Sequence, residues 1–329
     1  MRLVMIGTGP FAVPSFRGLF EMHHTIVALV TSPPRMHRGV KVPEVSDIRD
    51  IANEHQIPIF DPEAINTAES IQHLQDFDAD LLIVCDYGQI LSSETLATAR
   101  LGGINLHGSL LPKYRGAAPV NWAIYHGESV TGVTVIHMTP KVDAGPCIAQ
   151  AVIEIGPDET ADDLEVRLAE TGQWLVRRSV DLLEQGQIEV LPQNPLLASK
   201  APRLKKADGA VDWSRTASDL KNQVRALEPW PRTFTYWHRS KGRPVRLILG
   251  PLEVVDPEFL DEETIEKTDG AAAGQVISVS GGRLLVATGS GLVSPAAIQP
   301  AGKQMMPIEQ FLRGNRVEVD DRFGPESPD

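Results

Sequence analysis

Short apolar runs, separated by helical patterns, occupy the first half of the chain. The clearest run is LLIVC at 81–85, which has no side chain that would prefer water on either face of a strand. Strands of this kind are typical of parallel sheets, because helices cover both faces of such sheets. Comparable runs stand at 2–7 and 24–32. The alternation therefore predicts an α/β fold with a doubly wound, mostly parallel sheet.

A different pattern begins after a helix that the sequence predicts from Ala161 to about Glu184. The stretch 188–206 contains three prolines and little periodicity, which indicates a linker. Beyond it, short β-rich runs at regular spacing predict a small barrel. The expected organisation is thus a first domain of residues 1–187, a linker of residues 188–206 and a second domain of residues 207–329.

The charge of the chain narrows its possible partners. The 329 residues carry a formal net charge of −12, which argues against a general nucleic-acid or membrane binder. The stretch 200–246 is nevertheless net positive, so it is either a solvated surface or a face that meets a large anion. No run approaches the roughly 18 apolar residues of a membrane helix. A cytoplasmic protein that does not bind membranes is expected.

The sequence gives little support for a dinucleotide-binding site or for a cysteine-based disulfide or zinc site. The GTG stretch at 7–9 has Ala12 where a dinucleotide-binding turn has its third glycine, a replacement that such turns tolerate. Two prolines crowd the helix start, however, and the run 24–32 ends without a ribose-binding acid, so nicotinamide binding is disfavoured. Cys85 and Cys147 form no CxxC pair, and neither a disulfide framework nor a zinc site is implied.

The stretch NLHGSLLP at 105–112 places an amide and an imidazole two residues apart, at Asn105 and His107. Residues two apart on a strand point to the same side, and open α/β sheets bind ligands at the carboxyl ends of their strands. Asp143 lies in a loop after the strand predicted at 132–138. An aspartate can orient a histidine, and an asparagine amide can donate to an oxyanion. The three residues are therefore a candidate catalytic trio.

The sequence gives less support for a serine nucleophile or a metal site at this place. Ser109 does not stand in a G-x-S-x-G turn, so no serine nucleophile is predicted. A metal would need a third and a fourth ligand. His126 or His137 could be proposed, but both stand at ordinary helix or strand positions. No metal is therefore expected.

The same motifs carry a resemblance to a known family. NLHGSLLPKYRGAAP with DAGPCIAQ resembles the signature of the 10-formyltetrahydrofolate-dependent formyltransferases, and DYGQIL at 86–91 resembles their folate-pocket loop. VRALEPWPRTFTYW and IQPAGKQMMPIEQFLRG resemble the members of that family that act on methionyl-tRNA. The resemblance spans nearly the whole chain. It implies a formyltransferase-type Rossmann-like domain followed by a small β-barrel of oligonucleotide-binding type.

The resemblance also implies a reaction and roles for single residues. A formyl group would move from 10-formyltetrahydrofolate to the α-amine of methionyl initiator tRNA, for translation initiation, and the enzyme is expected to be a monomer. Asn105 and His107 would stabilise the oxyanion, while Asp143 would orient His107 and help to accept a proton. The folate donor would be bound by Ile90, Leu91, Ser109, Leu110, Leu111 and Pro112.

The tRNA is expected to meet basic residues in two places. The loop after the second strand supplies Arg35, Arg38 and Lys41, and the second half supplies Arg203, Lys205, Lys206, Lys241 and Arg243. That loop is shorter than is usual in the family, and the pair Asn121 and Trp122 also occurs in sugar-nucleotide formyltransferases. Two alternatives therefore stay open. One is a formyltransferase acting on an amino-sugar nucleotide, and the other is a non-catalytic RNA-binding module built on the barrel.

Overall fold

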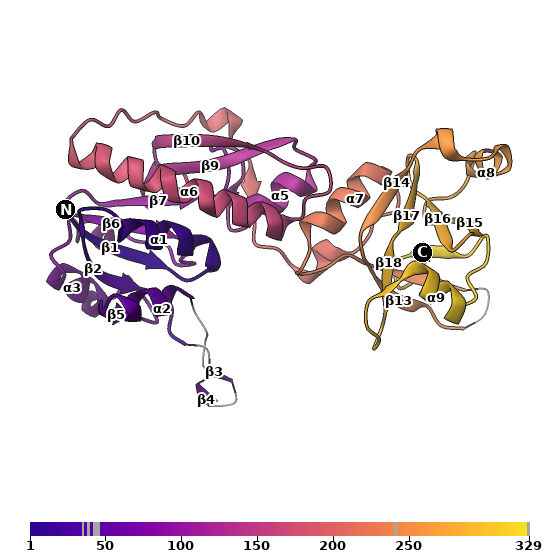
Figure 1. Ribbon diagram of the computed structural model, residues 1–329, viewed down its shortest axis with the longest axis horizontal. Coiled ribbons are helices and arrows are strands. Elements are labelled where there is room, and N and C mark those ends of the chain that lie inside the picture. The colour runs from indigo at the N-terminus through magenta and orange to yellow at the C-terminus, as the bar shows by residue number, and fades with distance from the viewer. Residues whose placement is uncertain (35, 38–39, 42–46, 240–241, 328–329) are drawn as a thin grey trace. The chain divides into compact units, whose positions relative to one another are not determined.

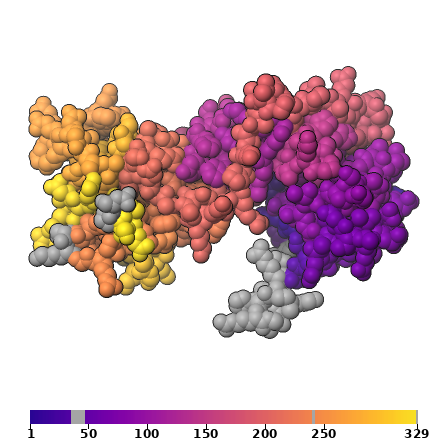
Figure 2. Space-filling view, turned by 180° about the vertical axis from the view of Figure 1, so that it is seen from behind, coloured from indigo at the N-terminus to yellow at the C-terminus, as the bar shows by residue number. Residues whose placement is uncertain are grey.

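The computed structural model describes residues 1–34, 36–37, 40–41, 47–239 and 242–327 (Figure 1; the remaining residues are grey in Figure 2). The chain divides into two compact units. The first contains residues 1–120, 130–155 and 163–203, and the second contains residues 121–129, 156–162 and 204–329. The second unit therefore includes two short pieces of chain from the first half of the sequence.

The first unit is built on a seven-stranded sheet. Its strands are β1 (Arg2–Gly7), β2 (Thr25–Val30), β5 (Ile59–Phe60), β6 (Leu81–Cys85), β7 (Gly103–His107), β9 (Val130–His137) and β10 (Cys147–Glu154). They lie in the order β10-β9-β7-β6-β1-β2-β5. The five strands from β7 to β5 in that order are parallel, as the apolar runs predict. β9 is antiparallel to both of its neighbours, and the loop of residues 138–146 joins it to β10.

Helices cover both faces of this sheet (Figure 1). They are η1 (Pro10–Ala12), α1 (Val13–Leu19), α2 (Asp47–Glu54), α3 (Ala68–Asp76), α4 (Ser93–Leu96) and α6 (Ala161–Glu184). On one face, Leu74 of α3 and Leu96 of α4 join the core that contains Val84 of β6. On the other face, α6 approaches β7 so closely that a Cβ at Gly172 would lie 2.4 Å from the Leu106 side chain. The prediction of a doubly wound α/β sheet is confirmed.

α6 occupies the range that the sequence predicts for it. Its buried apolar residues include Leu164, Leu168 and Leu175, which follow one another at intervals of about one and two helical turns. This spacing gives the helix one continuous apolar face for the sheet.

The second unit consists mainly of two antiparallel sheets. The five-stranded sheet contains β12 (Phe234–His238), β13 (Val245–Leu249), β18 (Ala297–Pro300), β19 (Met306–Pro307) and β20 (Arg322–Gly324). The four-stranded sheet contains β14 (Leu252–Val255), β15 (Val276–Ser280), β16 (Arg283–Ala287) and β17 (Leu292–Pro295). Both sheets contribute to one core, in which Trp237 of β12 and Val286 of β16 are 1% exposed. The small β domain that the sequence predicts is confirmed.

Three helices belong wholly to this second unit, which also includes residues 121–125 of α5 (Pro119–Tyr125), and the shorter elements of the chain complete the fold. The helices are α7 (Ala217–Ala226), α8 (Glu262–Thr268) and α9 (Ile308–Gly314). The short elements are β3 (Met36–His37), β4 (Val40–Lys41), β8 (Arg115–Gly116), β11 (Lys200–Ala201), η2 (Pro195–Leu197), η3 (Lys206–Gly209) and η4 (Pro257–Phe259). Among the described residues, no helix combines the length and apolar character that crossing a membrane requires.

Candidate active site

β7 presents the predicted amide and imidazole near its carboxyl end. Asn105 and His107 share one face of the strand, and Leu106 points to the opposite face, against α6. His107 is 5% exposed, whereas Asn105 is half-buried. In the described part of the chain the Asn105 amide has no hydrogen-bond partner, so its donors are available to a ligand.

Asp143 reaches these residues from the loop between β9 and β10. Its backbone is left-handed, with φ of 48°, which is uncommon for a residue with a side chain. The carboxylate accepts a hydrogen bond from the Gly116 amide at 2.9 Å and lies 3.7 Å from Nδ1 of His107. The predicted trio is therefore brought together at one place in the structure.

The hydrogen bonds of His107 determine which of its nitrogens carries a proton. Nε2 lies 2.9 Å from the Tyr114 carbonyl oxygen, which can only accept, so Nε2 donates. In the neutral imidazole, Nδ1 is then unprotonated and faces the Asp143 carboxylate. The unprotonated nitrogen and the carboxylate therefore lie next to each other, beside Asn105.

A cavity of about 90 Å³ lies beside Asn105 and Asp143. Its other lining residues are Ile90, Leu91, Ile136, Met138, Thr139, Lys141 and Val142. Sequence reasoning missed the residues from Met138 to Val142, although they stand within five positions of Asp143. Their proximity to Asp143 in the chain was the available signal.

The predicted folate residues fall into two groups. Ile90 and Leu91 line the cavity, and Asn66, which sequence reasoning missed, holds the Ile90 carbonyl at 2.8 Å. Ser109 to Pro112 do not line it. That loop is bound to the sheet instead, since Thr134 of β9 donates to the Ser109 carbonyl at 2.6 Å and accepts from the Leu111 amide at 3.1 Å.

The predicted tRNA-binding residues also divide. Arg35, Arg38, Lys241 and the Lys41 side chain lie outside the described residues. The other four are exposed, namely Arg203, Lys205, Lys206 and Arg243. Exposure makes these four accessible to a polyanion, and it is equally compatible with a solvated surface.

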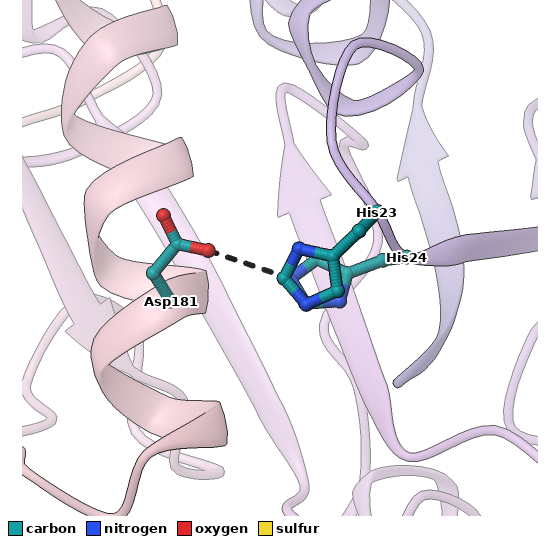
Figure 3. Close-up of side chains that lie close together, drawn as sticks. All are labelled: His23, His24 and Asp181. Carbon is teal, nitrogen blue, oxygen red and sulfur yellow. Dashed lines mark ion pairs between the residues drawn. The ribbon is translucent and has the colours of Figure 1, made fainter.

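Ligand atoms suited to a metal come together at a different place. Within the described residues, one group of three such side chains has its ligand atoms within 4.8 Å of one another: His23, His24 and Asp181 (Figure 3). Neither His107 nor Asp143 belongs to it. His24 precedes β2, so this group lies at the amino ends of the parallel strands, opposite the edge that carries the trio.

Comparison with known proteins agrees with this architecture. A family model described as formyl transferase matches residues 1–180, and a model described as formyl transferase, C-terminal domain, matches residues 203–316. Methionyl-tRNA formyltransferase of Rhodopirellula baltica is 42% identical over 96% of this chain and 95% of the relative. The chain belongs to the methionyl-tRNA formyltransferase family. The relative of that name in Geobacter sulfurreducens is 36% identical over 98% of this chain and 97% of its own length.

Solved structures share the fold of these formyltransferases at low sequence identity. WlaRD, a sugar 3N-formyl transferase crystallised with dTDP and 5-N-formyl-THF, superposes with a TM-score of 0.63 and 18% identity, covering 92% of this chain and 99% of that one. An N-formyltransferase from Helicobacter canadensis gives a TM-score of 0.62, with 91% and 98% coverage. At 18% identity this similarity shows the fold alone, and the expected enzyme class rests on the methionyl-tRNA formyltransferase relatives.

Proposed function

We propose that this chain transfers a formyl group from 10-formyltetrahydrofolate to the α-amine of methionyl initiator tRNA, acting as a cytoplasmic monomer. One observation carries the proposal. The unpartnered Asn105 amide and the His107–Asp143 pair meet at the carboxyl end of β7. They do so in a chain whose relatives over nearly its whole length are named methionyl-tRNA formyltransferase.

The reaction begins with the neutral amine of the aminoacyl group. An α-amino group has a pKa of about 7.7–8.0, so a useful fraction is already neutral at pH 7. Its nitrogen bonds to the formyl carbon, and the Asn105 amide donates to the oxyanion that forms. The His107–Asp143 pair takes the proton that the amine loses. His107 then passes a proton to N10 of the folate as the bond between N10 and the formyl carbon breaks.

The size of the cavity limits which part of the donor it can hold. A volume of about 90 Å³ is well below the 300–1,000 Å³ of common ligand pockets, so it suits the reacting group rather than the whole donor. We place the pterin end against Ile90 and Leu91, which line the cavity. Irregular loops supply the backbone donors and acceptors that a pterin edge needs.

Three acceptors distinguish the proposal from its alternatives. The full-length protein is incubated with 10-formyltetrahydrofolate and charged initiator tRNA, charged elongator tRNA or an amino-sugar nucleotide, and formylated product is quantified. Efficient formylation of initiator methionyl-tRNA alone is expected. Formylation of the amino-sugar nucleotide instead would show that a sugar nucleotide is the acceptor. Binding of tRNA without any transfer would favour the non-catalytic RNA-binding module.

The structure weakens one reason for considering a sugar acceptor. Asn121, part of the pair shared with sugar-nucleotide formyltransferases, donates its amide to the Ala226 carbonyl at 2.8 Å. Trp122 contacts Tyr125 edge-on and stacks against His126. Both side chains thus have packing roles within the second unit, and these roles need no sugar ligand.

tRNA binding by an acidic protein requires segregated positive charge. We propose that Lys205, Lys206 and Arg243 contact phosphates, so alanine at each should weaken tRNA binding and reduce the salt slope of log affinity by about 1. Arg38→Ala and Lys41→Ala should also lower turnover, if that loop positions the acceptor end. Lys267, which pairs with Glu263 on α8, is a matched control. An unchanged salt slope in the first three variants would identify a merely solvated surface.

A further inference from the structure

The segment from Leu191 to Ala201, expected only to connect two domains, packs against the loops of the active site. Leu191 and Cys147 exchange two backbone hydrogen bonds of 2.8 and 2.9 Å. β11 pairs with β8, which lies directly after Tyr114. The Tyr114 amide donates to the Ser199 hydroxyl at 2.8 Å, and the Tyr114 carbonyl is the acceptor for His107. The segment therefore contacts the backbone that orients the imidazole.

Gln193 makes the most extensive of these contacts. Its Nε2 donates to the carbonyls of Asp143 at 2.8 Å and Gly145 at 2.7 Å. Its Oε1 accepts from Nε of Arg115 at 3.1 Å and from Nη2 at 2.7 Å. An amide side chain has two N–H donors and two acceptor lone pairs, so these four contacts use its full capacity. One side chain thus joins the Asp143 loop to the loop that contains Arg115.

The conformation of Asp143 explains why such a contact matters. A residue with a side chain is disfavoured at positive φ and persists there only where the surroundings fix it. Gln193 binds the carbonyl of the left-handed residue itself and a second carbonyl two positions later. Its other end holds Arg115, which is adjacent to Gly116, the donor to the Asp143 carboxylate. Both sides of the Asp143–Gly116 hydrogen bond are therefore fixed through one glutamine.

We propose that Gln193 is a positioning residue for formyl transfer, which acts by holding the Asp143 carboxylate at its distance from His107. This inference rests on the proposed function. A misplacement of about 1 Å can cost on the order of 100-fold in rate. Loss of Gln193 should therefore lower kcat while leaving the binding surfaces for folate and tRNA in place.

The test compares Gln193→Ala, Gln193→Glu and Asn194→Ala in the full-length protein with charged initiator tRNA. Gln193→Ala should lower kcat on the order of 10- to 100-fold with KM values within about threefold of wild type. It should also shift the pH profile of kcat, because the His107–Asp143 pair is displaced. Gln193→Glu retains an acceptor for Arg115 but lacks the amide donors, so it should be similarly impaired. Asn194 caps η2 in the same segment and should leave kcat and its pH profile unchanged.

Each outcome decides the proposal. Normal kcat and an unshifted pH profile in Gln193→Ala would overturn it, as would a loss of activity explained entirely by a fall in melting temperature. If the alanine variant does not fold, Gln193→Met keeps the length without the polar atoms. Failure of that variant to fold would also overturn the proposal, since Gln193 would then be needed for folding. Absence of transfer in the wild type would refute the proposed function instead.

Discussion

Two histidine–aspartate pairs lie at opposite ends of the parallel strands of one sheet. We call the side where these strands end the carboxyl edge and the side where they begin the amino edge. His107 Nδ1 lies 3.7 Å from Asp143 at the carboxyl end of β7, and His24 Nε2 lies 3.7 Å from Asp181 at the amino end of β2. Both imidazoles are buried, with side-chain exposures of 6% and 0%. By distance and burial of the histidine alone, the two pairs would be judged equivalent.

Their surroundings differ in the ways that matter for chemistry. The Asp143 side chain is 15% exposed and beside a cavity, whereas the Asp181 side chain is 46% exposed. Nδ1 of His24 faces Glu184 at 3.5 Å, and its neighbour His23 pairs with the same carboxylate at 2.8 Å. The carboxyl edge adds a free amide, Asn105, while the amino edge adds only further charges. A histidine–aspartate distance therefore does not identify a catalytic site without a third group and a space for substrate.

Removal of each imidazole tests this distinction most strongly. His107→Ala should lower formyl transfer on the order of 100-fold or more, as expected when a group acting in the transition state is lost. His24→Ala should keep turnover within about twofold of wild type, while its free energy of unfolding falls by about 0.5–3 kcal/mol. Steady-state kinetics and thermal melts of the two variants measure both quantities.

Asn105→Ala provides the companion measurement at the carboxyl edge. It should show a loss comparable to that of His107→Ala with little change in folate affinity, because the amide acts on the oxyanion. Near-normal turnover in either variant, or an equal loss in His24→Ala, would show that the two edges are not distinguished by function.

Replacement of Asp143 and of Asp181 should give a smaller difference in turnover than replacement of the two histidines. Asp143→Asn keeps the shape of the side chain but removes the carboxylate charge beside His107, so turnover should fall on the order of 10- to 100-fold with the fold intact. Asp181→Asn should leave turnover unchanged. Melting temperatures serve as the control, and a rate loss that follows unfolding in Asp143→Asn would contradict the assigned role.

The sequence predicts the carboxyl edge well because its signals are local. The alternation of apolar runs located β6, and the two-residue spacing on β7 placed Asn105 and His107 on one face. Both inferences used residues within one strand. The position of Asp143 did not follow in this way, because β9 is antiparallel to β7 and its last residue, His137, lies opposite Ile104 near the start of β7. The loop after β9 therefore has to turn back to bring Asp143 to His107.

The remaining parts of the site depend on contacts between distant positions. Gln193 binds Asp143 from 50 positions away, and Ser199 binds Tyr114 from 85 positions away. Both partners are backbone groups, which every residue possesses, so no side-chain pattern marks them. The same holds at the amino edge, where α6 brings Asp181 to His24. Periodicity located α6 correctly but could not show which of its exposed residues would meet a histidine.

The last prediction concerns the pH dependence of stability at the amino edge. Burial, more than any other cause, lowers the pKa of His24 below its ordinary value of 6.5, although Glu184 acts in the opposite direction. The folded protein then binds fewer protons than the unfolded chain once the pH drops below about 6.5, so unfolding becomes easier as the pH falls towards the folded pKa. Above that window the imidazole is neutral in both states and the effect is absent.

His24→Gln removes this titration and should reduce the dependence of the free energy of unfolding on pH. Chemical denaturation between about pH 7.5 and about pH 5.5 should show wild type losing more stability than the variant, since only wild type contains the buried imidazole. His23→Gln, at the exposed neighbour, serves as the matched control and should follow wild type more closely. Parallel curves for wild type and His24→Gln would mean that the charges around His24 offset its burial. The two pairs would then differ less in their electrostatics than their geometry indicates.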